Sequence, residues 1–224
     1  DPQSGVLSGL NYGCTVNEPR KATIATERAQ SQKVHATIPD MPCTLDDLRE
    51  RLRNWKGIEI ANTANPVPGD GNPHATVVFI GEAPGAKEDQ QRRPFVGSAG
   101  KMLDSLLASI GLSRGDVYVT NVVKFRPPDN RDPTKAEKDA CMPFLRDALA
   151  IIRPRVVVPL GRHALAHFAP NVTIGDVHGR LLPSTEDYDV FPMYHPAAAL
   201  HNPGLRQTLK DDFAALGAYL RTNT

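Results

Sequence analysis

The sequence predicts an α/β fold, a three-layer αβα domain around a central, mainly parallel sheet of four strands. Short apolar runs typical of buried parallel strands alternate along the chain with amphipathic helical segments. Several of these runs lead directly into loops rich in glycine, proline and polar residues, where open α/β sheets bind ligands. Strands that alternate with helices form right-handed βαβ units, so their strands lie parallel in one sheet.

The chain has 224 residues, enough for one sizeable domain and an extension. Residues 1–42 show no sustained hydrophobic period and are expected to form a flexible N-terminal extension, which leaves 43–224 for the folded domain.

The formal net charge is only +1, so contact with a polyanion would need a local basic patch. No apolar run is long enough to span a membrane. The three cysteines form no CxxC pair, which favours a reducing compartment and indicates no metal site.

The first half of the folded part is expected to contain two helices and two strands. Thr44 and Asp47 have the spacing of a capping box, and the leucines that follow recur on one helical face. Ser98 is expected to cap the second helix and Gly111 to end it. These signals and two apolar runs predict helices over 44–56 and 98–110 and strands over 75–81 and 117–120.

The second half is expected to continue the alternation. Thr134 can cap a long helix, and Gly161 closes the next apolar run before a short one. Turn residues indicate a turn or hairpin before the last strand. The predicted elements are helices over 134–152, 162–168 and 205–221, strands over 156–160 and 190–194, and the hairpin over 172–183.

Three loops follow the carboxyl ends of strands and should converge on one rim of the sheet. They cover 81–97, 121–133 and 195–204. The first carries Glu82, and a carboxylate at the mouth of a sheet is costly unless it has a function. It also carries Phe95, while Asn121 and His195 each follow a strand directly. Each residue alone is a weak signal, but together they offer polar partners for a planar ring, a stacking face, and an acid or base.

Three segments of the chain resemble motifs of the uracil-DNA glycosylase superfamily, and within it the type-4 enzymes. They are GEAPGAKEDQQRRPFVGSAGKMLDSLL, TNVVKFRPPDNRDP and MYHPAAALHNPGLR, in this order and spacing. The resemblance covers about residues 45–220. It implies a monofunctional DNA-repair glycosylase that flips uracil out of DNA, hydrolyses its N-glycosidic bond and leaves an abasic site. Uracil-containing DNA would be the partner and free uracil the product. We expect a monomer in the bacterial cytosol or nucleoid.

The resemblance implies a role for each of the rim residues. Phe95 would stack on the uracil face, and Asn121 would read the base edge that carries N3–H and O4. His195 would donate a hydrogen bond to O2, where negative charge collects as the base leaves. Glu82 would stabilise the sugar cation and position or activate water.

The type-1 enzymes of the superfamily differ from this chain in the first loop. They carry an aspartate and a tyrosine where this chain has Ala83 and Gly85, so the role of the base passes to Glu82. Without the tyrosine that excludes thymine's methyl group, Glu88 is the candidate for that gate, and a solvated loop carboxylate is the equal alternative. The residues expected around uracil are Gly81, Ala83, Glu88, Phe95 and Asn121.

Contacts with the DNA backbone would come from basic and hydroxyl side chains near the rim, although solvated surface charge is the alternative for each. The candidates are Lys87, Arg92, Arg93, Ser98, Lys101, Arg126 and Arg206. Leu200 would wedge between base steps, and a shift of register would put Ala199 there instead.

The type-4 enzymes usually hold an iron–sulfur cluster on four cysteines. By register the ligands would lie near Trp55 and Ile58, at Phe125 and at Cys141, and only the last position is a cysteine here. We therefore expect no cluster, no other cofactor and no metal, with the large apolar residues filling the vacated space.

Two other functions stay open at this stage. One is a non-catalytic module that binds uracil or abasic sites in DNA, and the retained Glu82, Asn121 and His195 argue against it. The other is a small-molecule hydrolase on a similar sheet, whose behaviour would depend on neither salt nor DNA.

Overall fold

A sheet of five strands forms the middle layer of the computed structural model, which describes residues 44–182, 184 and 186–222. The strand order is β1-β3-β2-β4-β5. The strands are β1 (Asp70–Gly71), β2 (Val77–Gly81), β3 (Tyr118–Asn121), β4 (Val156–Pro159) and β5 (Asp189–Val190). All neighbouring strands pair in parallel except β1, which is antiparallel to β3. The predicted fold class is confirmed, but the predicted number of four strands missed β1, whose two residues are too few to show a pattern.

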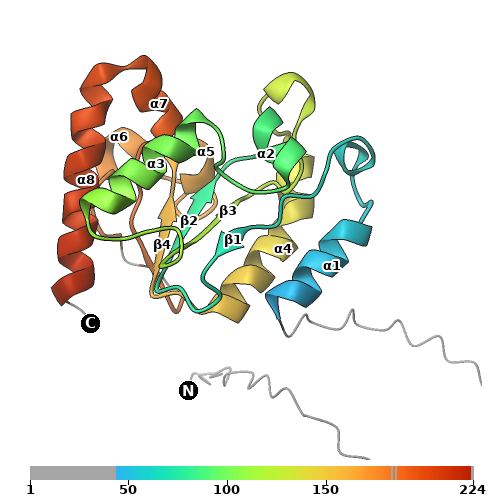
Figure 1. Cartoon of the computed structure of the whole chain (residues 1–224), viewed down its shortest axis with the longest axis horizontal. Helices are drawn as coiled ribbons and strands as arrows, with labels where there is room; N and C mark the ends of the chain where they lie inside the picture. The colour runs from blue at the N-terminus through green and yellow to red at the C-terminus, as the bar shows by residue number, and fades with distance from the viewer. Residues whose placement is uncertain (1–43, 183, 185, 223–224) are drawn as a thin grey trace, which may run out of the picture.

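Helices cover both faces of this sheet (Figure 1). They are α1 (Leu45–Asn54), α2 (Ala86–Gln91), α3 (Ser98–Ser109), α4 (Lys135–Ile152), α5 (Gly161–Leu165), α6 (Ile174–Val177), α7 (Pro196–His201) and α8 (Pro203–Thr222). Short 3₁₀ helices cover Glu59–Asn62 and Pro128–Asn130. The five predicted helices are all present. The short α2 and α7 lie in segments predicted as loops, and the predicted hairpin is α6 followed by a bridge between Leu182 and Val190. The predicted extension 1–42 lies outside the described residues.

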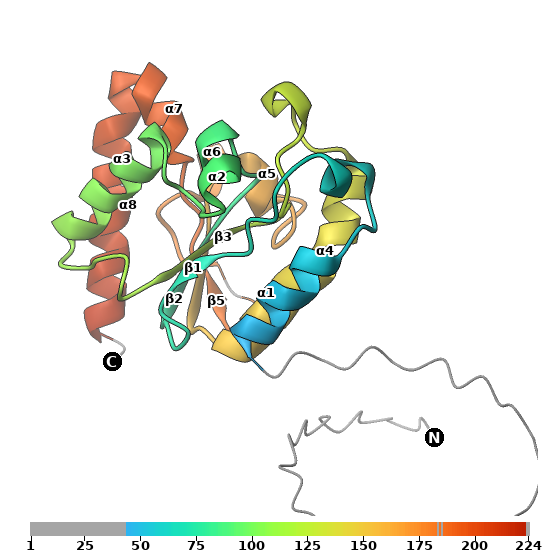
Figure 2. The same cartoon turned by 45° about the vertical axis from the view of Figure 1, so that its right-hand side comes forward.

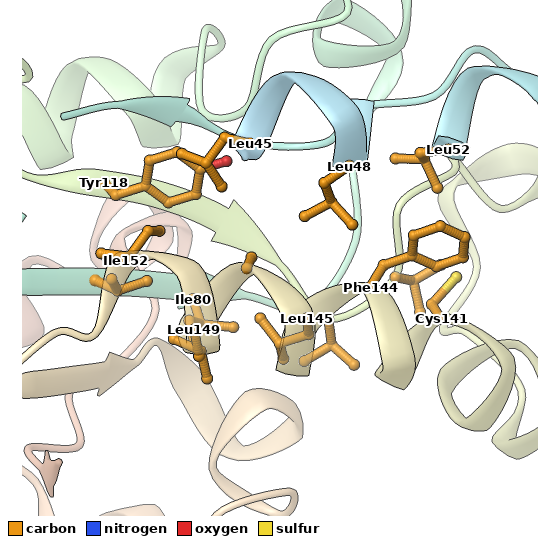
Figure 3. Close-up of a cluster of buried hydrophobic side chains, with 14 of the residues drawn as sticks. Leu45, Leu48, Leu52, Ile80, Tyr118, Cys141, Phe144, Leu145, Leu149 and Ile152 are labelled. Carbon is orange, nitrogen blue, oxygen red and sulfur yellow. The ribbon is translucent and has the colours of Figure 1, made fainter. Parts of the chain in front are cut away.

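The side chains of β2 alternate between two cores, which gives the three layers. Val78 and Ile80 pack in the cluster formed with α1 and α4, whereas Val77 and Phe79 pack in the cluster formed with α3 and α8. The two views agree that α1 and α4 lie side by side on one flank and α3 and α8 on the other (Figures 1 and 2). Figure 3 shows the leucines of α1 above the apolar side of α4. Burial on both faces explains why β2 reads as a continuous apolar run.

The caps of α1 and α4 form as the sequence predicts. The Thr44 hydroxyl accepts the Asp47 N–H, and the Asp47 carboxylate accepts the Thr44 N–H. Thr134 and Glu137 form the same reciprocal pair at α4. In the described part of the chain, no helix is both long and apolar enough to cross a bilayer.

The prediction that Ser98 caps α3 is wrong. Gly97 occupies the cap position and Ser98 is the first helical residue, with no capping bond from its side chain. A distant carboxylate replaces it, because Glu88 Oε1 accepts the N–H groups of Val96 (2.9 Å) and Gly97 (2.8 Å). The helix ends as expected before Gly111, whose φ of 79° is in the left-handed region.

Acid is expected to weaken the fold through Glu137. Hydrogen bonds from Arg131 and the Thr134 backbone lower the pKa of the Glu137 carboxyl from 4.5 to about 2. A depressed folded-state pKa stabilises the fold above pH 4.5, and that stabilisation is lost as the pH falls toward 2. Measured by urea unfolding, the stability difference between the natural chain and Glu137→Gln should shrink across this range. The exposed Glu50→Gln variant is the control, and a difference independent of pH would contradict the prediction.

Candidate active site at the carboxyl edge of the sheet

The carboxyl ends of β2 and β3 bring two of the predicted site residues together. Gly81 pairs with Asn121 in the parallel register, and the pairing continues through the Val123 N–H to the Glu82 carbonyl at 2.9 Å. Glu82 and Asn121 therefore leave the sheet at the same edge. In Figure 1 this edge lies toward α2, α5 and α7.

The Phe95 ring and the Asn121 amide both pack against Gly81. A Cβ atom at this position would lie 2.4 Å from Asn121 Oδ1 and 2.7 Å from Phe95 Cζ. The Phe95 ring in turn stacks on the His195 ring, with centroids 5.6 Å apart and planes inclined by 29°. An aromatic ring, an amide and an imidazole from three separate segments thus lie close together, and of these three only His195 lines the pocket that also holds Glu82.

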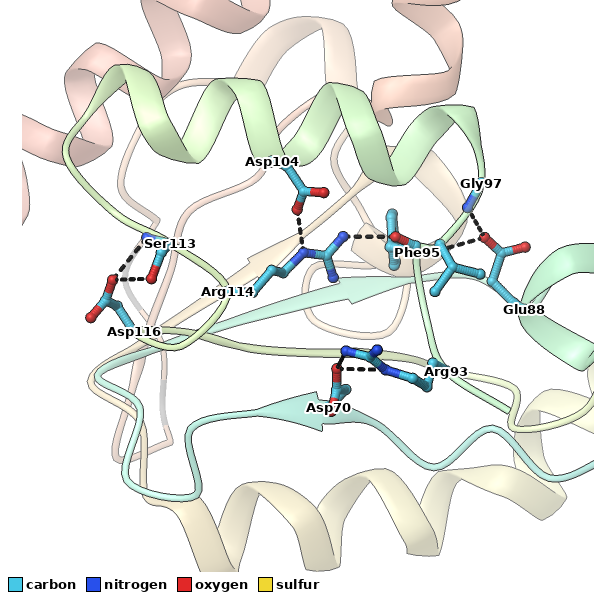
Figure 4. Close-up of polar contacts among 10 residues, drawn as sticks. Asp70, Glu88, Arg93, Phe95, Gly97, Asp104, Ser113, Arg114 and Asp116 are labelled. Atoms are coloured by element: carbon cyan, nitrogen blue, oxygen red, sulfur yellow. Dashed lines mark hydrogen bonds and ion pairs between the residues drawn. The ribbon is translucent and has the colours of Figure 1, made fainter. Parts of the chain in front are cut away.

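The backbone of Phe95 is held in an unusual conformation to place its ring there. Its φ is 53°, which non-glycine residues rarely adopt. Its carbonyl accepts a 2.7 Å hydrogen bond from Arg114, which also pairs with Asp104 (Figure 4). Gly100 permits this approach, because a Cβ there would lie 1.7 Å from the same carbonyl oxygen. Surrounding contacts of this kind are what allow a strained residue to persist.

The Glu88 carboxylate is not a free, solvated loop group. Its Oε1 atom is the acceptor for the turn before α3, as Figure 4 shows at Gly97. Its Oε2 atom lies 2.9 Å from where a Cβ of Gly85 would be. The carboxylate also acts on His195, since its charge raises the pKa of that imidazole.

His195 is a neutral imidazole with a defined tautomer. Burial lowers its pKa to about 4, and this effect outweighs the charge of Glu88. Its Nδ1 accepts the Ala197 N–H at 3.1 Å at the start of α7. The proton of the neutral ring is therefore on Nε2, which remains available as a hydrogen-bond donor.

Glu82 lies in a pocket of about 570 Å³, which Ala83, Asp132 and His195 also line. Its Oε1 atom is the one buried side-chain oxygen or nitrogen without a hydrogen-bond partner in the described part of the chain. Burial raises the pKa of the Glu82 carboxyl. Two potential cations face Oε1, with His163 Nδ1 at 3.4 Å and Lys138 Nζ at 3.7 Å.

In the described part of the chain, one group of histidine and carboxylate side chains lies close enough together to share a metal ion. It consists of Glu82, Asp132 and His163. Their ligand atoms lie within 4.8 Å of one another. The Lys138 ammonium already neighbours Glu82, and Asp132 is largely exposed. An ammonium beside the shared carboxylate disfavours a second cation there.

The basic and hydroxyl residues predicted to contact DNA are all exposed except Arg126, which is partly buried. Lys87, Ser98 and Lys101 are exposed on α2 and α3. The arginines make contacts within the protein: Arg92 with Asn65, Arg93 with Asp70, Arg126 with Asn130, and Arg206 with the Ala199 carbonyl.

The structure counts against Ala199 as a wedge. This residue of α7 is fully buried in the core with α3 and α8, so its side chain reaches no surface. Leu200, the next residue, is partly exposed. The register question raised by the sequence therefore favours Leu200.

Lys124 is a residue near the site that sequence reasoning missed. Its side chain is 1% exposed, and its ammonium donates to Thr120 Oγ1 (2.7 Å) and to the Asn121 carbonyl (2.6 Å). Burial lowers its pKa to about 7. It braces the backbone that carries the Asn121 amide. No local signal distinguishes such a lysine from a surface one.

An aromatic cluster lies beside the sheet, where α1 and α4 meet. Trp55 stacks on Phe125 with centroids 5.9 Å apart and meets Phe144 edge-on at 5.1 Å. Cys141, labelled with Phe144 in Figure 3, is fully buried, and burial raises the pKa of its thiol.

Known proteins share this sequence over most of its length. The family model of the uracil DNA glycosylase superfamily matches residues 68–220. The type-4 uracil-DNA glycosylase of Archaeoglobus fulgidus is 45% identical over 184 residues, covering 78% of this chain and 92% of that protein. The type-4 uracil-DNA glycosylase of Saccharolobus solfataricus is 48% identical over 158 residues, covering 66% and 73%. The matched residues include the whole rim described above, and the chain belongs to the uracil-DNA glycosylase superfamily.

Proposed function

We propose that this protein excises uracil from DNA by hydrolysing the bond between the base and its deoxyribose, which leaves an abasic site. The observation that carries the proposal is the meeting of Phe95 and Asn121 over Gly81, with neutral His195 stacked on the Phe95 ring and Glu82 leaving the same edge of the sheet. The names of the type-4 relatives point to the same reaction.

The ring and the amide that meet at Gly81 offer the contacts that a flipped pyrimidine needs. The Phe95 ring offers a stacking face, and base–aromatic stacking contributes roughly 1–3 kcal/mol. The Asn121 amide carries both a donor and an acceptor, as the O4 and N3–H edge of uracil requires. Cytosine presents the opposite pattern on that edge, so the same amide would disfavour it.

His195 would stabilise the leaving base. Uracil departs as an anion whose charge collects at O2, and the Nε2–H of a neutral imidazole can donate to that oxygen. A low pKa suits this task, because a neutral donor stabilises the anion without protonating it. Glu82 would face the other reaction partner, the cationic sugar, and would position the attacking water.

Glu88 and Leu200 would serve selection and base flipping. Glu88 Oε2 lies next to Gly85, where a methyl group on the base would need room, so its carboxylate is the proposed gate against thymine. Leu200 would enter the duplex as the wedge. The exposed Lys87, Ser98 and Lys101 are the proposed phosphate contacts, with Arg126 and Arg206 at the rim.

The residues at the four expected iron–sulfur positions do not fit a cluster. Trp55, Ile58 and Phe125 offer no thiolate, and the packed rings of Trp55, Phe125 and Phe144 occupy the space beside Cys141. We therefore propose that catalysis uses no iron. The purified protein should contain no stoichiometric iron and lack the visible absorbance of a cluster. Stoichiometric iron bound by the natural chain, and lost in Cys141→Ser, would contradict this.

Base release from defined DNA tests the function. A duplex with a single uracil is incubated with the protein and then treated with alkali, which breaks the strand at abasic sites. A strand break is expected with uracil and not with thymine at that position. Binding without breakage would favour the alternative of a non-catalytic module. We also propose that the chain is a monomer and that it acts in the bacterial cytosol or nucleoid, where a DNA substrate would be found.

A further inference from the structure

His163 on α5 has no part in the roles assigned above, although it lies against Glu82. The Arg162 Nε–H group donates to His163 Nε2 at 3.1 Å. A guanidinium is always protonated, so Nε2 must accept in this contact. The proton of the neutral imidazole is then on Nδ1, the atom that lies 3.4 Å from Glu82 Oε1.

Glu82 needs such a partner. Oε1 is buried with no hydrogen bond, and burial alone favours the protonated acid, which could not stabilise a cationic sugar. His163 and Lys138, from α5 and α4, lower the pKa of Glu82, while Asp132 raises it.

Three further charged groups lie close by, namely Asp132, Arg162 and Arg131. The largely exposed Asp132 has its Oδ2 atom 3.6 Å from His163 Nε2. Arg162 acts through His163, as described above. Arg131 lines the pocket but is occupied by its bidentate pair with Glu137. His163 is therefore the neighbour of Glu82 that can place an N–H group on Oε1 through a defined tautomer.

We propose that His163 is a positioning residue for Glu82, whose Nδ1–H holds Oε1 so that the carboxylate stays anionic and fixed beside the reacting sugar. The inference rests on the proposed function and deepens it. The 3.4 Å contact is not a hydrogen bond in the free protein. Catalytic hydrogen bonds are often long or poorly aligned in a free enzyme and tighten when substrate binds, so the proposal expects this contact to shorten. His163 itself transfers no proton in this scheme.

The experiment measures single-turnover uracil release at saturating protein between pH 5 and 9. His163→Ala should slow release at neutral pH by about tenfold or more, because a misplaced catalytic group loses rate steeply. The protein concentration for half-saturation should not change. The acid limb of the pH profile should move to higher pH, because Glu82 loses a neighbour that favours its anion. The substitution should leave the pKa of His195 unchanged, because the charge that acts on His195 is that of Glu88. The shift of the acid limb is therefore assigned to Glu82.

Rescue separates positioning from packing. His163→Asn can put an amide N–H near the place of Nδ1, whereas His163→Gln puts its amide nearer to Nε2. We expect His163→Asn to retain most of the rate and His163→Gln to lose it. If His163→Ala does not fold, this comparison still tests the proposal. His74→Ala, an exposed imidazole before β2, is the control.

Each outcome decides between the proposals. An unchanged rate and acid limb in His163→Ala, or equal rates in the Asn and Gln variants, would overturn the role of His163. A slower variant whose acid limb stays in place would also overturn it, because loss of packing alone produces that result. Failure of the unsubstituted chain to release uracil would instead overturn the proposed function.

Discussion

Replacing His195 by alanine is expected to slow uracil release by about two to three orders of magnitude, the usual effect of losing one donor to a developing anion. The Nε2–H of the neutral ring is the group lost, and the Phe95 ring also loses its stacked neighbour. Single-turnover release from a uracil duplex measures the effect. Affinity for abasic duplex should persist, because the proposed phosphate contacts lie elsewhere on the rim.

His195→Ala removes a helix cap as well as the hydrogen-bond donor to the base, so its effect on stability must be separated from its effect on the rate. His195 Nδ1 accepts the Ala197 N–H at the start of α7, so alanine should also cost about 1 kcal/mol of stability. Thermal unfolding of the variant measures this term. His195→Gln, whose amide can reach toward the base, should recover part of the rate. A His195→Ala protein as fast as the natural one would remove the anion-stabilising role.

A single methyl group on Gly81 is expected to cost about a hundredfold in uracil release. The added Cβ would fall 2.4 Å from Asn121 Oδ1 and 2.7 Å from Phe95 Cζ, so both walls of the base pocket must move. Displacements of about 1 Å cost roughly this factor in a catalytic site. Weaker capture of uracil should accompany the slower rate.

Gly115→Ala is the matched control for Gly81→Ala. A Cβ at Gly115 would have only Ser113 Oγ near it, at 3.6 Å, which is an ordinary contact. Its rate should equal that of the natural chain. Near-normal release by a folded Gly81→Ala protein would show that uracil does not bind between Asn121 and Phe95.

Much of the fold could be predicted because its signals are local. The capping boxes at Thr44 and Thr134 need only residues three positions apart, and the central strands β2 and β4 are buried along their length, so each reads as an apolar run. The parallel arrangement then brings Glu82 and Asn121 to one edge without further information, because parallel strands end on the same side.

The remaining features depend on partners that are distant in the sequence. The left-handed Phe95 is held by Arg114 and by close approach to Gly100. The acceptors of the Lys124 ammonium are only three and four residues away, but a distant segment packs against this lysine, because the Val67 N–H donates to the Lys124 carbonyl. His163 reads as an ordinary polar residue of a short helix until α5 packs near Glu82. Tertiary contacts, rather than local preference, assign these side chains their positions.

The proposed role of Glu88 in base selection is coupled to its role in stabilising the fold, because each carboxylate oxygen serves one of them. One oxygen holds the turn that starts α3, and the other lies beside Gly85, where we propose that it excludes a methyl-bearing base. A mutation that opened the pocket to larger bases by removing this carboxylate would also release the α3 turn. Broader lesion range would therefore come with a loss of thermal stability, so natural variation at position 88 should be accompanied by compensating changes. Directed evolution toward new lesions would need a stabilised starting protein.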